Sequence, residues 1–142
     1  MKMQSDVYPQ PFLISPFGQD SCYLLFADQV APYEIEGQTF YQYETYVLTE
    51  PYRDTLEQEI STQYDLWLQK AKDFDRQQQA HQVRQRRNRL LNQSDWTQMP
   101  DIESHITLSW RTYRQALRDI PQQQQFPYDI QWPSPPEIIE VR

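Results

Sequence analysis

The sequence predicts an α+β fold: an N-terminal β-hairpin or small antiparallel sheet, a long helix, and a helical C-terminal region with a Pro-rich extended tail. Three observations predict it. Aromatic or β-branched residues alternate with polar ones over residues 40–47, which is the period of a strand. Gly and Pro are absent from residues 52–99, so nothing there interrupts a helix. A second apolar stripe, with helical spacing, occupies residues 106–120 and is followed by a proline-rich segment.

Residues 1–50 are expected to form an extended arm followed by the hairpin. Prolines at positions 9, 11 and 16 favour the extended arm, and Glu36-Gly37 favours a turn between a buried strand at 22–27 and the strand at 40–47. Cys22 is the only cysteine. We interpret it as a small buried hydrophobic residue, the alternative being an inter-chain disulfide, which requires an exposed thiol and a cysteine of another protein.

Residues 51–83 are expected to form a long amphipathic helix, capped by Asp54 or Thr55. One helix over residues 54 to about 91 would have roughly 38 residues and a length of about 57 Å. A compact domain of this size has a diameter of only about 40 Å. Either the helix breaks near residues 77–79, or its apolar seam is buried against another chain. We therefore hypothesise that four seam residues bind a protein partner: Ile60, Tyr64, Trp67 and Phe74.

Composition excludes several classes of function. The 142 residues carry a net charge of -7, which argues against binding to nucleic acids and to anionic membranes. No apolar run approaches the roughly 18 residues of a spanning helix, and residues 1–12 lack the apolar stretch of a secretory signal. We expect the product to stay in the cytoplasm of the cell that makes it. Aromatic residues make up 14% of the chain, which favours a modest core together with a protein-binding surface.

The residues that usually carry catalysis are scarce. The chain has two histidines (His81 and His105), two glycines and one cysteine, and no metal-ligand spacing or phosphate-binding loop. We expect no enzymatic activity, no metal and no cofactor. An arginine run is the one basic feature: Arg84, Arg86, Arg87 and Arg89. A solvated helix face, or arginines paired with carboxylates, is favoured over phosphate contacts, because the rest of the chain is acidic.

The segment 84–142 also carries an ordered set of motifs. The matching positions are Arg84, Arg87-Asn88, Leu91, Ser94-Asp95-Trp96, Pro100-Asp101, Trp110, Tyr113-Arg114-Gln115-Ala116-Leu117-Arg118-Asp119-Ile120-Pro121, Phe126-Pro127 and Trp132-Pro133. This order resembles the phage tail fibre assembly proteins, also called the phage tail assembly chaperone family. The family's hallmarks are an arginine-asparagine helix, an (S/T)DW turn, a W-x-x-YRQALRDIP helix and a closing WP. The resemblance covers about the last 60 residues, and residues up to about 75 do not share it.

The resemblance implies a non-enzymatic protein that folds, trimerises or caps a tail fibre in the host cytoplasm, without a cofactor. Its implied partners are a trimeric tail fibre protein and baseplate proteins, with no nucleic acid and no membrane. The alternatives are a permanent structural component that connects fibre and baseplate in the virion and, less favoured, a nucleic-acid-binding regulator. A chaperone that leaves after assembly and an adaptor that stays are both compatible with the resemblance.

The motif residues also have a physical interpretation as a fold signature. Ser94 or Asp95 is expected to cap the turn, and Trp96 to fold back onto Leu91. Arg114 and Arg118 are expected to reach Asp119 or Asp101. Trp132 is expected to seal the open side of the cluster. The residues assigned to this motif and its core are Asn88, Leu91, Asp95, Trp96, Trp110, Tyr113, Arg114, Leu117, Asp119 and Trp132.

Overall fold

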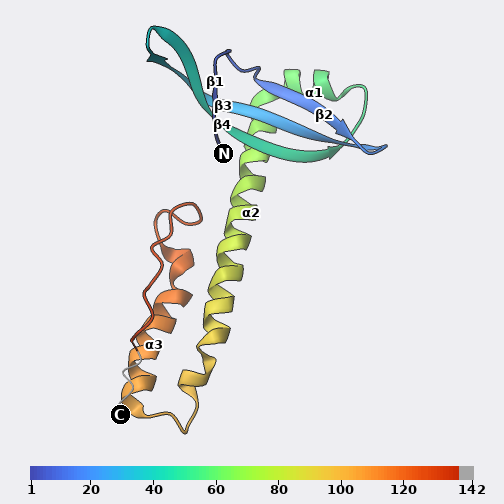
Figure 1. The fold of residues 1–142 in the computed structure, drawn as a ribbon. Helices are drawn as coiled ribbons and strands as arrows, with labels where there is room; N and C mark the ends of the chain where they lie inside the picture. The colour runs from blue at the N-terminus through green and yellow to red at the C-terminus, as the bar shows by residue number, and fades with distance from the viewer. Residues whose placement is uncertain (138–142) are drawn as a thin grey trace. The chain divides into compact units, whose positions relative to one another are not determined.

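The computed structural model describes residues 1–137 and divides the chain into two compact units, unit 1 over Met1–Asp75 and unit 2 over Arg76–Arg142 (Figure 1). Unit 1 contains a four-stranded antiparallel sheet and unit 2 is helical, so the α+β class is confirmed. The three segments expected from the sequence, residues 1–50, 51–83 and 84–142, are thus distributed over two units. The boundary between these units falls inside a helix.

The sheet of unit 1 has the strand order β1-β4-β3-β2. Its strands are β1 (Lys2–Ser5), β2 (Phe12–Phe17), β3 (Ser21–Ile35) and β4 (Gln38–Pro51). The predicted hairpin is β3–β4, and its turn places Glu36 and Gly37 at φ of 51° and 81°. Two consecutive positive φ angles are typical of the turn that matches the twist of a hairpin.

The expected extended arm is wrong, because residues 1–20 supply both edge strands of the sheet. Prolines do not prevent this arrangement. The Pro11 carbonyl accepts a hydrogen bond from the Ala27 amide, so the even-numbered residues of β2 direct their backbone groups to the open edge. Pro16 is one of these residues, and its missing N–H costs no hydrogen bond within the sheet.

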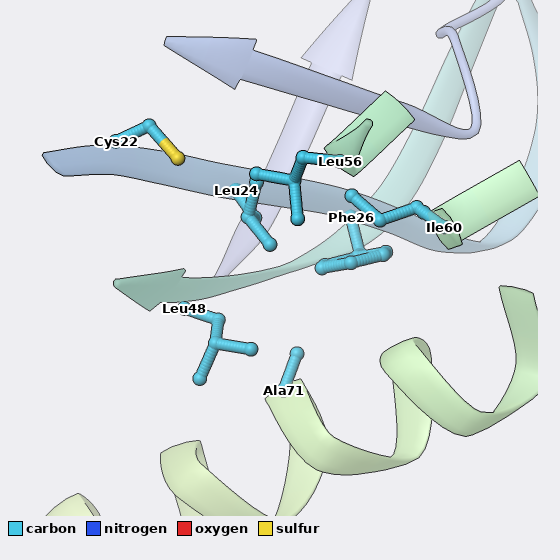
Figure 2. Packing of buried hydrophobic residues seen from close by; sticks show 7 residues of the cluster. All are labelled: Cys22, Leu24, Phe26, Leu48, Leu56, Ile60 and Ala71. Carbon is cyan, nitrogen blue, oxygen red and sulfur yellow. The ribbon is translucent and has the colours of Figure 1, made fainter. Parts of the chain in front are cut away.

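The core of unit 1 lies between one face of this sheet and two helices, α1 (Leu56–Thr62) and α2 (Tyr64–Gln93). Figure 2 shows the side chains converging from strands and helices alike: Cys22, Leu24, Phe26, Leu48, Leu56, Ile60 and Ala71. In β3 every second residue from 22 to 26 is fully buried, as expected for a strand with one covered face.

The predicted single helix is interrupted at Gln63, whose φ of -127° and ψ of 44° are not helical. The break expected at residues 77–79 is absent, and α2 continues for 30 residues, about 45 Å. Ile60 of α1 and Ala71 of α2, on either side of the break, enter the same core. Thr55 is the N-cap residue of α1, but its Oγ1 donates to Glu59 Oε2 (3.0 Å) instead of capping the helix.

Unit 2 contains the remainder of α2, the 3-10 helix η1 (Asp95–Gln98), α3 (Ser104–Arg118), the 3-10 helix η2 (Ile120–Gln122) and a tail without helix or strand up to residue 137. α3 ends at Arg118, and Pro121, which cannot continue that helix, lies in the first turn of η2. Glu103 is the N-cap residue of α3. Buried Tyr113, Leu117 and Ile120 form the centre of this unit's core.

Candidate functional site

The buried side chain of Arg114 joins three segments of unit 2. Its Nη1 donates to the Leu91 carbonyl at the end of α2 (2.6 Å) and to Ser94 Oγ (2.8 Å), and its Nη2 donates to Asp95 Oδ1 in η1 (2.7 Å). A planar guanidinium can satisfy several acceptors in fixed directions, which a lysine cannot do. These four residues, Leu91, Ser94, Asp95 and Arg114, are called the Arg114 cluster below.

The expected partners of Arg114 were therefore wrong. The predicted pairing with Asp119 rested on helical spacing, but Arg114 turns to the corner between α2 and η1. Asp119 instead accepts a hydrogen bond from Gln115 Nε2 (3.0 Å). The expected cap at the turn was also wrong, since no side chain caps η1. Ser94 Oγ donates to carbonyls of the last turn of α2, at 2.9 Å from Leu90 O and 3.1 Å from Leu91 O.

Two threonines that the sequence reasoning missed complete the corner. Thr97 is fully buried, and its Oγ1 donates to the Ser94 carbonyl (2.6 Å). Thr107 Oγ1 of α3 donates to the Thr97 carbonyl (3.0 Å). The hydroxyls thereby satisfy backbone carbonyls that the end of a helix leaves unpaired. A signal was present in the sequence, because hydroxyl residues directly after a helix often bond to the backbone in this way.

Aromatic rings cover the outside of this corner. The Trp110 ring lies 5.4 Å from Tyr113 in an edge-to-face arrangement and 6.1 Å from Trp96. Tyr113 and Leu117 are buried, and Leu91 and Trp110 are half-buried against them. Trp96 remains 40% exposed, so its assignment to the core was wrong, and its ring meets Trp110 at the surface.

The arginine run of α2 faces the tail of unit 2. The Arg84 guanidinium lies over the Phe126 ring (5.4 Å) and the Arg86 guanidinium over the Trp132 ring (4.2 Å). A cation over an aromatic face is attracted by the ring's quadrupole. Phe126 and Trp132 are also half-buried against the core of unit 2, so the arginines fasten the tail to α2. These contacts differ from the solvated face or carboxylate pairing that the sequence favoured.

Asn88 does not belong to the core. Its side chain is exposed, and its Oδ1 accepts two hydrogen bonds from the neighbouring Arg87, from Nε at 3.1 Å and Nη2 at 3.0 Å. Among the residues assigned to the motif and its core, Asn88 is thus a motif residue at the surface. Its place is on the outer surface of α2, where it orients an arginine of the basic run.

Comparison with known protein families finds a match within unit 2. Residues 80–137 match the family model described as phage tail assembly chaperone protein. This stretch is similar to phage tail assembly chaperone proteins, and we call it the chaperone region below. The resemblance inferred from the motifs is confirmed over that range, and it implies protein partners in the phage tail. No curated protein and no solved structure matches the chain.

The chaperone region, residues 80–137, contains the whole Arg114 cluster and every aromatic contact described above. It starts on α2 and includes η1, α3, η2 and the described tail. Unit 1, with its sheet and α1, lies entirely outside the matched range. The family motifs thus coincide with a compact unit that has its own core.

Unit 1 holds the four residues that were predicted to bind a partner. Ile60 is fully buried in the core of its own unit, so its assignment to an exposed seam was wrong. Tyr64 and Trp67 are half-buried against that core, and Tyr64 Oη donates to the carbonyls of Pro11 and Ala27, both at 3.3 Å. Phe74 alone of the four remains exposed.

Cys22 is also fully buried in unit 1 (Figure 2). Its Sγ lies 3.5 Å from the Glu50 carbonyl and donates to it. Burial raises the pKa of the thiol, and the negative charge of Glu50 raises it further. A buried, neutral thiol cannot reach a cysteine of another chain, so the alternative of an inter-chain disulfide is wrong for this fold.

The histidines are surface residues. His105 Nδ1 lies 3.3 Å from Glu103 Oε2, and both side chains are largely exposed, which makes the pair weak. His81 is exposed on α2. Among residues 1–137, no three His, Cys, Asp or Glu side chains come together as metal ligands. Over the same residues, no helix has the length and apolarity needed to cross a membrane.

Proposed function

We propose that this protein is a non-enzymatic assembly chaperone that binds a phage tail fibre protein and stabilises it while it folds and trimerises in the host cytoplasm. The observation that carries the proposal is the match of residues 80–137 to the phage tail assembly chaperone family. The fibre, the cytoplasmic location and the lack of catalysis are parts of the proposal.

The arrangement of polar groups in unit 2 supports a scaffold rather than a reaction centre. Arg114, Ser94 and Thr97 are buried and form hydrogen bonds with one another or with backbone carbonyls. Such a network fixes a corner of the fold.

The contacts of the basic run support a protein partner over a nucleic acid. Arg84 and Arg86 lie over aromatic rings of their own unit. The chain as a whole has a net charge of -7, which repels a phosphate backbone.

Trp96 is the residue of the chaperone region that we propose as a fibre contact. It is exposed, it rests on Trp110, and exposed Met99 follows it in the same turn. Tryptophans anchored on a rigid support dominate the binding energy of many protein interfaces. We expect Trp96→Ala to weaken fibre binding at least tenfold while leaving unit 2 folded.

Co-expression tests the proposal directly. A tail fibre protein of the same phage is produced alone, with the wild-type chain, with Trp96→Ala, and with Leu66→Ala as a matched control. Leu66 is exposed on α2 in unit 1, outside the chaperone region. We expect soluble fibre trimers with the wild type and the control, and fewer with Trp96→Ala. Equal yields of soluble trimer with and without the wild-type chain would remove the chaperone function.

Mass spectrometry of purified particles separates the two forms of the proposal. A chaperone that leaves after assembly is absent from the particles. An adaptor that stays between fibre and baseplate is present in a fixed ratio to the fibre.

A further inference from the structure

Within unit 1, the helices pack on one face of the sheet and leave the opposite face without a helix. Side chains of successive residues in a strand point to opposite faces. The even-numbered residues of β2 and β3 point to the core, as do Tyr46 and Leu48 of β4. The register therefore aligns Leu13, Leu25 and Val47 directly across three strands on the opposite face. Leu13 is 51% exposed and Val47 is 43% exposed.

Two aromatic rings extend this apolar row. Phe17 of β2 and Tyr23 of β3 stack with their centroids 4.2 Å apart. Both are odd-numbered in their strands and so lie on the same face as Leu13 and Leu25, and both are substantially exposed. We call the five residues Leu13, Phe17, Tyr23, Leu25 and Val47 the outer sheet face.

The outer sheet face carries no charged side chain. The other positions between its members are Ser15, Ser21 and Thr49. Charged residues of the same strands face the helices instead: Glu50 pairs with Lys70, and Asp28 Oδ2 lies 2.6 Å from Lys72 Nζ. The chain has 23% charged residues, so an apolar face without charges stands out from the rest of the surface. It suits a partner that binds without ion pairs and without electrostatic attraction during approach.

We propose that the outer sheet face is the surface through which two copies of this chain pair. A twofold contact places the same patch on both sides, so any charged residue near its centre would meet a like charge. A face with only apolar and hydroxyl side chains is compatible with itself. Two such sheets can stack about 10 Å apart with their side chains interdigitating, as in a β-sandwich.

The size of the face sets the strength of the pair. Its four exposed members are 37 to 51% accessible. With side-chain areas of about 150–250 Å² for aromatic residues and less for Leu and Val, the face offers roughly 300–400 Å² per copy. The pair would bury roughly 600–800 Å², below the roughly 1,200 Å² of stable complexes. We therefore expect a weak, concentration-dependent dimer with a Kd in the micromolar range or above.

Sedimentation velocity of the full chain tests this proposal without any tail protein, so the result is independent of the function proposed above. Between about 1 μM and about 1 mM, the mean mass of the wild type is expected to rise from 17.3 kDa toward twice that value. Added NaCl is expected to strengthen the dimer, because it screens the repulsion between two acidic copies. A wild type that stays at 17.3 kDa over the whole range would overturn the proposal.

Substitutions locate the contact. Leu13→Asp is expected to weaken the dimer at least 100-fold, since the pair would bury two like charges. Leu66→Asp makes the same change on exposed α2 and is expected to leave dimerisation unchanged. Val47→Thr keeps the β-branched shape and is expected to weaken the dimer about tenfold. This variant locates the contact even if the circular dichroism spectrum shows that Leu13→Asp does not fold. Self-pairing through this face would be contradicted if Val47→Thr left dimerisation unchanged. It would also be contradicted if the wild type were a monomer and Leu13→Asp lost fibre binding.

Discussion

Replacing Arg114 by methionine tests whether its guanidinium holds the corner between α2, η1 and α3. Methionine keeps an unbranched apolar stem but removes the donors to Leu91 O, Ser94 Oγ and Asp95 Oδ1. Hydrogen bonds from a charged donor contribute about 1.5–3 kcal/mol each. Asp95 is mostly exposed, so water replaces its lost partner at little cost. Ser94 Oγ keeps its own bonds to carbonyls of α2.

The bonds from Nη1 therefore dominate the expected loss, which we place at about 3 kcal/mol in the free energy of unfolding of unit 2. A unit of roughly 70 residues has a total stability of about 3–10 kcal/mol, so the substitution removes a large share of it. The expected decrease in Tm is about 10–20 °C. Arg114→Lys keeps a charge but not the planar fork, and we expect it to recover only part of the loss.

Urea unfolding followed by tryptophan fluorescence measures this loss. Three of the four tryptophans, Trp96, Trp110 and Trp132, lie in unit 2 and report on it. Arg111→Met is the matched control, since Arg111 is exposed on the same helix. We expect the control to unfold within about 0.5 kcal/mol of the wild type. If Arg114→Met also unfolds within that margin, the Arg114 cluster does not hold the corner.

Three further predictions follow from the packing. Trp132→Ala removes the ring under Arg86 and part of the core of unit 2. We expect the free energy of unfolding of unit 2 to fall by about 2–3 kcal/mol and a protease to cleave the tail faster. Unchanged cleavage would contradict this expectation. Cys22 is expected to react with a thiol reagent only as fast as unit 1 opens, and fast labelling of the native protein at neutral pH would refute its burial. Burial raises the pKa of this thiol from 9.0. The stability that the neutral thiol contributes is therefore present below pH 9.0 and is lost as the pH rises through the folded pKa. Phe74 is exposed, so Phe74→Asp is expected to change the free energy of unfolding by less than about 0.5 kcal/mol. Trp67 packs against the core of unit 1, so Trp67→Asp is expected to lower it by about 2 kcal/mol or more. Thermal melts followed by circular dichroism measure both changes, and equal losses would place both side chains in the core.

The parts of the fold that the sequence predicted are those with a local pattern. Alternation over residues 40–47 corresponds to the middle of β4, and the 4-3-4-3 spacing of residues 106–120 corresponds to α3 and the start of η2. Glu36-Gly37 forms the predicted turn, in which Gly37 adopts its positive φ without steric cost. These features depend on nearby residues alone, so they can be read from one short window.

Elements that depend on distant partners were not predictable in this way. β1 and β2 lie in a proline-rich segment, and they become strands because β4 and β3 offer them an edge. The break at Gln63 has no local cause, since glutamine is an acceptable helix former. Residues on both sides of it, Ile60 and Ala71, pack into one core.

The candidate site, like the fold, was predictable only where its features depend on nearby residues. Motif order was sufficient to infer the chaperone family, and the periodicity identified Tyr113 and Leu117 as an apolar stripe. Spacing on one helix suggested Asp119 as the partner of Arg114, whereas the acceptors come from residues about 20 positions earlier. The rings over Arg84 and Arg86 also come from far along the chain, so a single helix pattern contains no sign of them.

The most direct test of the proposed chaperone function is the yield of native tail fibre with and without this protein. A tail fibre protein of the same phage is expressed alone or together with the chain, and the soluble trimer is quantified by size-exclusion chromatography and imaged by electron microscopy. We predict that the fibre alone aggregates or misassembles, and that co-expression restores soluble trimers to which this chain binds. Native trimers at equal yield without the chain, together with no binding to it, would contradict the proposal.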